Sequence, residues 1–227
     1  MKHPDRNQCY EYLKEKNTPQ HVVGHCKSVA AVAYILGRAL NEAGGTKAVP
    51  FGEIKFKKTK FTQSGREHYM QDPSCKAVGT AYRDFDLELV LASGLLHDIA
   101  RKEERHWDVG ADFCKNLNLP EEENIIRIHM QYEFTNDEQN LTEADLVCLG
   151  DRLSIEDRYV GLDKRMDYII DKAIRHGHPE AAPVILRKKE VTRQLLNGIE
   201  KRIGYSIDEL MNDIDYENIE GTCNDNR

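Results

Sequence analysis

The sequence has no apolar run long enough to cross a membrane. Its longest apolar stretches, residues 28–36 and 89–96, are about half the roughly 18 residues that a membrane helix needs. It also has no excess of basic residues, because 32 Lys and Arg stand against 39 Asp and Glu and give a net charge of −7. Since phosphate neutralisation by Lys and Arg supplies most of the affinity of general nucleic-acid binders, the composition argues against that class as well as against membrane insertion.

Paired cysteines are also missing. The six cysteines are scattered and form no C-x-x-C pair, which argues against a structural zinc knuckle or a redox dithiol. We expect all six to be reduced thiols, which fits a cytoplasmic chain. The length of 227 residues and the 40% apolar content indicate one folded domain over residues 1–211. Residues 212–227 are predicted to form an acidic C-terminal tail.

Helix signals dominate the remaining sequence. Thr18-Pro19 provides an N-cap and a first-turn proline, and Ser206-x-x-Glu209 is a capping box. Strands do not alternate with helices and no repeat is present, so the fold class is predicted as all-α. The predicted helices span residues 18–40, 84–99, 106–117, 142–155, 162–176 and 179–203, with another beginning at residue 120 and a short one at residue 206.

One stretch, residues 44–83, does not follow the helical pattern. Partial alternation of apolar and polar residues in 53–61 predicts a strand pair, and residues 44–70 carry six basic and two acidic residues. A connection of this length is often a lid, a binding loop or a disordered insertion. Its lysines fit either a basic flap over a polyanionic substrate or the solvated face of an exposed hairpin. These lysines are Lys55, Lys57, Lys58 and Lys60.

Polar residues interrupt four apolar helical segments. They are His25, the pair His97-Asp98, His129 and Asp151. A buried carboxylate costs several kcal/mol unless it is paired or binds a metal. A single His or Asp near a helix end is usually hydrogen-bonded or half exposed, but four such positions together favour one shared site. Imidazole and carboxylate groups suit Zn, Fe, Mn, Ni or Co, and helical bundles often build metal sites from facing helices.

The order His, His-Asp, Asp on separate helices resembles the HD-domain metal-dependent phosphohydrolases. The matching segments are HCKSVA at residues 25–30, GLLHDIA at 94–100 and LGDRL at 149–153. The resemblance covers about residues 18–165 and implies an HD-domain helical bundle with the basic insertion between the first two motif helices. One departure is Gly150, where the family often has Ala, and we expect it to leave the ligand set intact.

Two further histidines resemble a subgroup of this family. His106 and His129 are similar to the additional histidines of six-ligand bacterial HD hydrolases of dinucleoside polyphosphates. The resemblance implies one or two divalent transition-metal ions (Fe, Mn, Co, Ni or Zn). The implied metal ligands are His25, His97, Asp98, His106, His129 and Asp151. If two ions bind, Asp98 would bridge them. If one ion binds, His106 and His129 would contact phosphate or transfer protons. Asp98, His106 and His129 are therefore the candidate catalytic residues.

Phosphate recognition requires cationic donors near the ligands. Arg101 and Lys102 follow the His-Asp pair by one helical turn, and Arg152 and Arg158 follow Asp151. Each is a candidate substrate-binding residue, with a solvated surface charge as the alternative. The expected partner is a small phosphorylated substrate of the nucleotide type, with no general nucleic-acid binding and no membrane. The sequence is compatible with an oligomer.

Three functions follow from this pattern. The leading hypothesis is a metal-dependent phosphohydrolase that cleaves a phosphoester or phosphoanhydride bond with a metal-activated water. The alternative is a di-iron oxygenase, because some HD proteins with a similar ligand pattern use O₂. A non-catalytic nucleotide sensor is a third hypothesis, which the intact ligand set disfavours.

Overall fold

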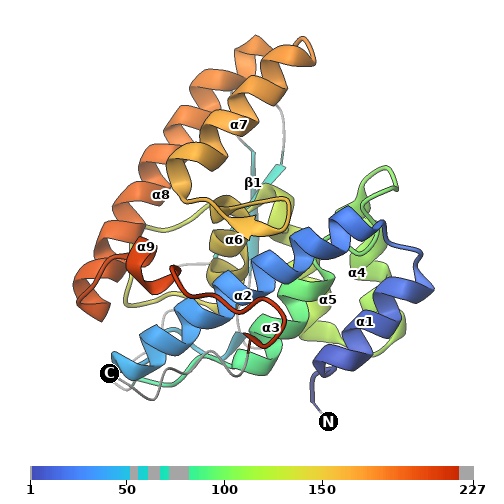
Figure 1. The fold of residues 1–227 in the computed structure, drawn as a ribbon, viewed down its shortest axis with the longest axis horizontal. Coiled ribbons are helices and arrows are strands. Elements are labelled where there is room, and N and C mark those ends of the chain that lie inside the picture. The colour runs from blue at the N-terminus through green and yellow to red at the C-terminus, as the bar shows by residue number, and fades with distance from the viewer. Residues whose placement is uncertain (1, 52–55, 61–66, 72–81, 220–227) are drawn as a thin grey trace.

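The central element of the fold is helix α2 (Gln20–Glu42), which is packed between α3 (Leu87–Leu96) and α6 (Glu143–Leu153). The computed structural model describes residues 2–51, 56–60, 67–71 and 82–219, and most of these residues are helical (Figure 1). The prediction of an all-α fold is therefore confirmed. The described helices include no segment both long and apolar enough to cross a bilayer.

The first helix, α1 (Arg6–Glu15), was not among the predicted elements. It begins with a capping box in which Asp5 accepts a hydrogen bond from the backbone of Gln8 while the Gln8 side chain binds the backbone of Asp5. Its buried residues Cys9 and Leu13 pack towards α3. The capping-box motif D-x-x-Q at residues 5–8 therefore indicates the start of α1 in the sequence.

Helices α4 (His106–Asn116) and α5 (Pro120–Ile128) pack against each other, and a 3₁₀ turn, η3 (His129–Gln131), continues α5. The predicted starts at residues 106 and 120 are confirmed. The start of α2 differs slightly, because Pro19 occupies the N-cap position and Thr18 Oγ1 donates to the Ile99 carbonyl oxygen at 2.8 Å instead of capping the helix.

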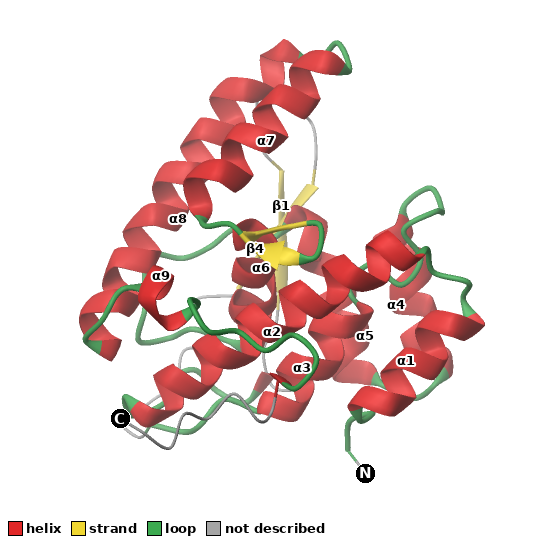
Figure 2. Cartoon of the chain, viewed as in Figure 1, coloured by secondary structure: helices red, strands yellow, loops and turns green. Residues whose placement is uncertain are grey.

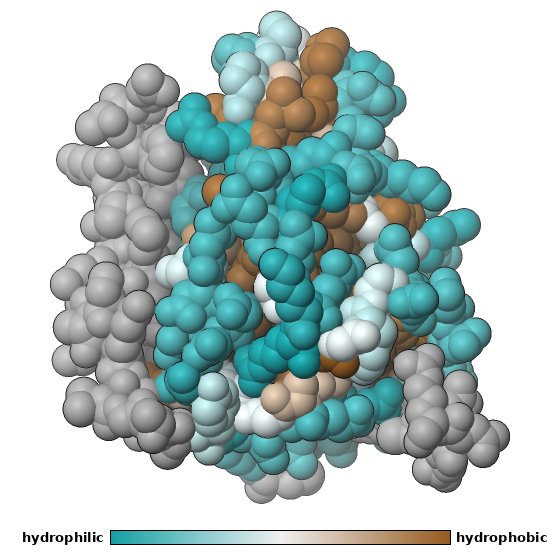
Figure 3. Space-filling model, turned by 90° about the vertical axis from the view of Figure 1, so that its left-hand side faces the viewer, coloured by the Kyte–Doolittle hydropathy of each residue, from teal (hydrophilic) through white to brown (hydrophobic). Residues whose placement is uncertain are grey.

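The C-terminal helices form a long hairpin. It consists of α7 (Leu162–Arg175), the 3₁₀ turn η4 (Pro179–Ala181) and α8 (Ala182–Ile203), and it extends away from the bundle (Figure 1). Helix α9 (Ile207–Leu210) follows. Figure 3 shows that this side is mainly hydrophilic, with apolar residues near the tip of the hairpin, where Ile174, Val184 and Leu186 are exposed.

Strands are few, as Figure 2 shows. In the insertion, β1 (Phe56–Lys60) pairs antiparallel with β2 (Glu67–Gln71), so the predicted strand pair is confirmed. A backbone bridge between Thr46 and Arg83 joins the two ends of the insertion, and Lys55 lies outside the described residues. A second small pair, β3 (Ser154–Ile155) and β4 (Arg158–Tyr159), follows α6 directly.

Two glycines let neighbouring helices approach α2 closely. A Cβ atom at Gly94 of α3 would lie 2.6 Å from the Ala30 Cα, and one at Gly150 of α6 would lie 2.5 Å from the Val29 carbonyl oxygen. Both distances are shorter than a carbon atom permits, so backbone packs on backbone at these points. The backbones of α3 and α6 therefore pack directly on the backbone of α2, which brings together the helices on or next to which His25, His97 and Asp151 lie.

The core surrounds α2 on both sides. Val29 and Leu36 of α2 belong to a cluster with α6 and the C-terminal hairpin, whereas Ala30 and Ala31 pack with α1, α3 and α4. The described cysteines are free and buried, as expected for reduced thiols: Cys9, Cys26, Cys114 and Cys148. Cys75 and Cys223 lie outside the described residues.

The last described residues, 212–219, belong to the segment predicted as an acidic tail. They fold back along the bundle, where Ile219 is fully buried and Tyr216 packs beside the same cluster as α1. Glu217 pairs with Lys27 of α2 at 2.9 Å. This part of the segment is therefore attached to α1 and α2.

Candidate metal centre

The His97-Asp98 pair lies directly after the last residue of α3. Both side chains are almost fully buried. His97 Nδ1 lies 2.9 Å from the Gly94 carbonyl oxygen, and because a carbonyl oxygen only accepts, Nδ1 carries the proton. Nε2 is therefore left with a lone pair directed away from the helix, which is the arrangement of a metal-binding imidazole whose other nitrogen is held by the protein.

His25 and Asp151 come from α2 and α6. His25 Nε2 lies 3.1 Å from Asp151 Oδ1, and its Nδ1 lies 3.2 Å from the Glu156 carbonyl oxygen in the β3–β4 turn. That turn holds Glu156 in a left-handed conformation, with φ 51°. The ring of His25 is 5.3 Å from the ring of His97, so the first and second parts of the motif are neighbours in space.

His106 and His129 stand on the other side of Asp98. His106 is the first residue of α4, and its Nε2 is 3.1 Å from Asp98 Oδ1. His129 begins η3, donates from Nδ1 to the Ile126 carbonyl oxygen at 2.7 Å, and places Nε2 3.6 Å from Asp98 Oδ1. The structure thus brings all six residues predicted as ligands into one cluster.

The donor atoms of this cluster fit a metal ion. They form two groups whose donor atoms lie within 4.8 Å of one another, His25–His97–Asp98 and Asp98–His106–His129, and Asp98 belongs to both. The buried atoms Nε2 of His97, Nε2 of His129 and Oδ1 of Asp98 have no hydrogen-bond partner. Since buried polar atoms are rarely left without partners, a metal cation would supply the partner that these atoms lack.

The protonation states also suit a metal. Burial lowers the pKa of His97 to about 4, so its imidazole is neutral at pH 7. Burial opposes ionisation of Asp98, but the imidazoles of His97, His106 and His129 outweigh that effect and hold the pKa of its carboxyl well below its usual range. Partial burial opposes ionisation of Asp151, whose side chain is 27% exposed, but Arg165 and His25 outweigh it and lower the pKa of its carboxyl. Neutral imidazole and ionised carboxylate are the forms that bind metals.

Two arginines reach the cluster. Arg101 Nη1 lies 2.9 Å from His106 Nε2 and 3.5 Å from Asp98 Oδ1. Arg165, on the first turn of α7, donates from Nη2 to Asp151 Oδ1 at 2.8 Å, and its Nε is buried without a partner. Arg165 was missing from the predicted site because it is fourteen residues beyond Asp151 on a different helix. No local motif marks it.

The other three predicted substrate-binding residues make their contacts elsewhere. Lys102 donates to the Asn17 carbonyl oxygen. Arg152 donates to Thr192 and to the Tyr132 carbonyl oxygen, and its guanidinium lies 4.1 Å from the centre of the Phe134 ring. Arg158 is exposed and pairs with Asp157. Arg152 therefore links α6 to α8 in the described structure.

One of three comparisons with known proteins found a match. The sequence pattern of the HD domain matches residues 22–156, more than half of the chain, and the matched range includes every residue of the histidine and aspartate cluster. Neither a curated protein nor a solved structure matches the chain.

Proposed function

The chain belongs to the HD-domain family of metal-dependent phosphohydrolases, and we propose that it hydrolyses a phosphoester or phosphoanhydride bond of a nucleotide or another small phosphorylated metabolite. One arrangement carries the proposal: two candidate metal-ligand groups share Asp98, and the half-buried Arg165 stands beside them, held by Asp151. Metal ligands alone would fit many reactions. The arginines add the recognition of an anion.

The proposal includes two ions of a divalent transition metal. His25, His97 and Asp98 would hold one, His106 and His129 together with Asp98 would hold the other, and Asp151 would complete the first. Bound metal supplies Lewis acidity and lowers the pKa of a water molecule towards neutrality. The carbonyl oxygens behind His25, His97 and His129 keep the Nε2 lone pairs directed into the site.

The guanidinium groups orient the substrate in this proposal. Arg165 is fixed by Asp151, so its guanidinium can donate to a phosphoryl oxygen with little loss of side-chain entropy. The side chain of Arg101 is 38% exposed and therefore lies at the rim of the cluster, where its Nη1 contacts His106 Nε2. Together they would neutralise charge that develops on the departing phosphate.

For the substrate we propose a nucleotide that carries more than one phosphate, including dinucleoside polyphosphates. The six-ligand pattern supports this class, because it resembles that of hydrolases acting on such compounds. A panel of mononucleotides, dinucleoside polyphosphates and sugar phosphates, scored for released phosphate or nucleotide, tests the choice of substrate.

A di-iron oxygenase is the second candidate, since the same shared Asp98 fits a pair of iron ions. The two arginines favour the phosphohydrolase, because a substrate that an oxygenase oxidises at carbon does not require a cationic group for its binding. Substrate-dependent O₂ consumption by iron-loaded protein would support the oxygenase. Phosphate release under anaerobic conditions would exclude it as the main activity.

The decisive experiment combines metal analysis of anaerobically purified protein with the substrate panel. We expect about two transition-metal ions per chain and hydrolysis that Asp98→Ala abolishes. Asp112→Asn is the matched control, because Asp112 is an exposed carboxylate on α4 that pairs only with Arg127 in the described structure. Unchanged hydrolysis in Asp98→Ala would refute the proposal.

A further inference from the structure

The only tryptophan of the chain stands next to the metal centre. Trp107 follows His106 at the start of α4, and the centre of its indole lies 5.2 Å from the centre of the His106 ring, with 79° between the ring planes. We propose that Trp107 stacks on the nucleobase of the substrate and so selects nucleotides over phosphates that carry no base. This inference rests on the proposed phosphohydrolase function and concerns the part of the substrate that the metal ions and the arginines do not bind.

The indole lies on the inner side of its helix. At about 100° per residue, Trp107 falls between Gly110 and Ala111 around the axis of α4, and both of these residues are buried. A Cβ atom at Gly110 would lie 3.2 Å from the Ile126 side chain, so this side of α4 faces α5. Trp107 is one turn closer to the start of α4, which is the end that carries His106. The helix therefore places the indole beside the metal centre and not on its outer side.

The hydrophobic core does not account for this position. Val109 and Phe113 of the same helix pack against the buried cluster shared by α1, α3 and α4, whereas Trp107 packs against neither buried cluster of the described residues. Its indole is half-buried, although tryptophan is on average a highly buried residue. A large aromatic side chain that stays outside the core, next to a candidate metal ligand, fits a role in binding the substrate.

The contact between the two rings leaves a face of the indole for a base. In an edge-to-face pair the edge of one ring points at a single face of the other, so His106 covers at most one face of the Trp107 ring. Among the described side chains, His106 is the only ring in contact with the indole. Every nucleobase has a flat π-face, so an aromatic side chain with an uncovered face can stack on any of them.

The same imidazole contacts a group that is proposed to bind phosphate. Arg101 Nη1 lies 2.9 Å from His106 Nε2, and the indole of Trp107 packs against the His106 ring. A phosphate bound by Arg101 and the metal ions would therefore lie close to a base that is stacked on Trp107. The sugar of a nucleotide joins these two groups covalently, so one substrate molecule can occupy both positions.

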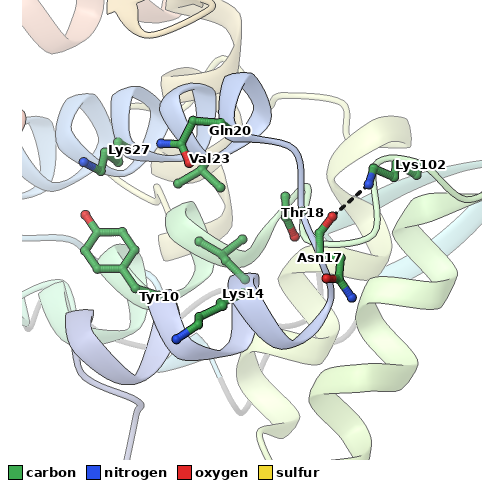
Figure 4. A pocket seen from close by; sticks show the side chains of 9 residues that line it. Tyr10, Lys14, Asn17, Thr18, Gln20, Val23, Lys27 and Lys102 are labelled. Carbon is green, nitrogen blue, oxygen red and sulfur yellow. Dashed lines mark hydrogen bonds between the residues drawn. The ribbon is translucent and has the colours of Figure 1, made fainter.

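The open hollow between α1 and α2, of about 670 Å³, is the other place where a base could bind (Figure 4). It contains an aromatic ring, that of Tyr10. Its three lysines, however, pair with groups of the protein itself: Lys14 with Glu11, Lys27 with Glu217, and Lys102 with the Asn17 carbonyl oxygen. The metal centre therefore matches the two halves of a nucleotide better than this hollow does.

The test is titration of the full, Mn²⁺-loaded chain with AMP and with ribose 5-phosphate, which share the sugar and the phosphate and differ only in the base. Because the chain has a single tryptophan, its fluorescence reports on Trp107 alone, and AMP should quench it whereas ribose 5-phosphate should not. Calorimetry should show that AMP binds about fivefold or more tightly. Trp107→Leu should reduce the affinity for AMP to that for ribose 5-phosphate, and Trp107→Phe, which keeps an aromatic face, should retain most of the preference.

Two controls locate the base. Phe113→Leu removes a half-buried aromatic ring from the same helix, and Tyr10→Leu removes the ring of the hollow between α1 and α2; both should leave the preference for AMP unchanged. Equal affinity of the wild type for the two compounds, or a Trp107→Leu chain that binds both more weakly by the same factor, would overturn the stacking role and leave the proposed hydrolase intact. Absence of binding of both compounds would overturn the phosphate site, and the stacking role with it.

Discussion

The buried ion pairs of His3 predict a loss of stability at alkaline pH. The imidazole of His3 is 1% exposed, and its Nδ1 lies 2.7 Å from Glu122 Oε1, on an equally buried side chain. Its Nε2 lies 3.3 Å from Asp86 Oδ2, on the N-cap residue of α3. Burial opposes protonation, but the carboxylates of Asp86 and Glu122 outweigh it and raise the pKa of His3 to about 9.

The sign and size of the effect follow from linkage. A raised pKa means that the folded state binds the proton more tightly than the unfolded state, where the pKa is about 6.5. The stabilisation is therefore complete below pH 6.5 and is lost as the pH rises through 9. The full shift corresponds to about 3 kcal/mol, and because Asp86 is 31% exposed, solvent screening reduces the expected loss to about 2 kcal/mol.

The assay is urea unfolding of the wild type and His3→Gln at intervals from pH 6.5 to 9.5. Gln cannot be protonated, so the stability difference between the two proteins should be largest at pH 6.5 and should shrink by about 2 kcal/mol at pH 9.5. His21→Gln is the control, because His21 is exposed on α2. A difference that stays constant over this range would refute the reasoning.

Three further predictions follow from buried contacts. Gly150→Ala should destabilise the fold by about 1–3 kcal/mol and reduce the metal content, because the added Cβ would force α6 away from α2; thermal unfolding and metal analysis measure both. Arg165→Met should raise the KM of phosphate release more than Arg165→Lys does, because Lys keeps the positive charge and loses only the paired N–H donors of the guanidinium. Steady-state kinetics measures the KM of both variants. Burial raises the pKa of Asp145 to about 6, so the folded state binds this proton more tightly than the unfolded state does. The difference in unfolding free energy between the wild type and Asp145→Asn should therefore shift by about 2 kcal/mol against the wild type between pH 4 and 6.5, which urea titrations measure.

Five of the six candidate metal ligands could be predicted from the sequence because they interrupt apolar helical runs, whereas His106 follows a charged segment and was predicted only from the family resemblance. His97-Asp98 follows eight consecutive buried residues of α3, and a charge placed there requires a partner. The main helices could also be predicted, because their apolar periodicity and their capping residues indicate the same segments. Arg165 was not readable, because its role depends on the direction in which α7 leaves the β3–β4 turn.

Contacts made by backbone atoms were also beyond the sequence. The contact of His25 with the Glu156 carbonyl oxygen uses a backbone atom that every residue type has, so the identity of residue 156 does not predict it. Thr18 looked like an N-cap, yet its hydroxyl binds the Ile99 carbonyl oxygen across the bundle. In both cases a long-range partner competes with the local pattern, and only the folded structure decides which interaction forms.

The distribution of the candidate metal ligands along the chain has a consequence for folding. His25 and Asp151 meet across 126 residues of sequence, with the His97-Asp98 pair, His106 and His129 between them. No shorter segment of the chain can assemble the cluster, so the site forms only when α2 to α6 have all come together. An ion bound there would favour the folded state by mass action and would join five elements at one point. Metal uptake would then report on complete folding, and a truncated or partly unfolded chain would bind no metal at this cluster.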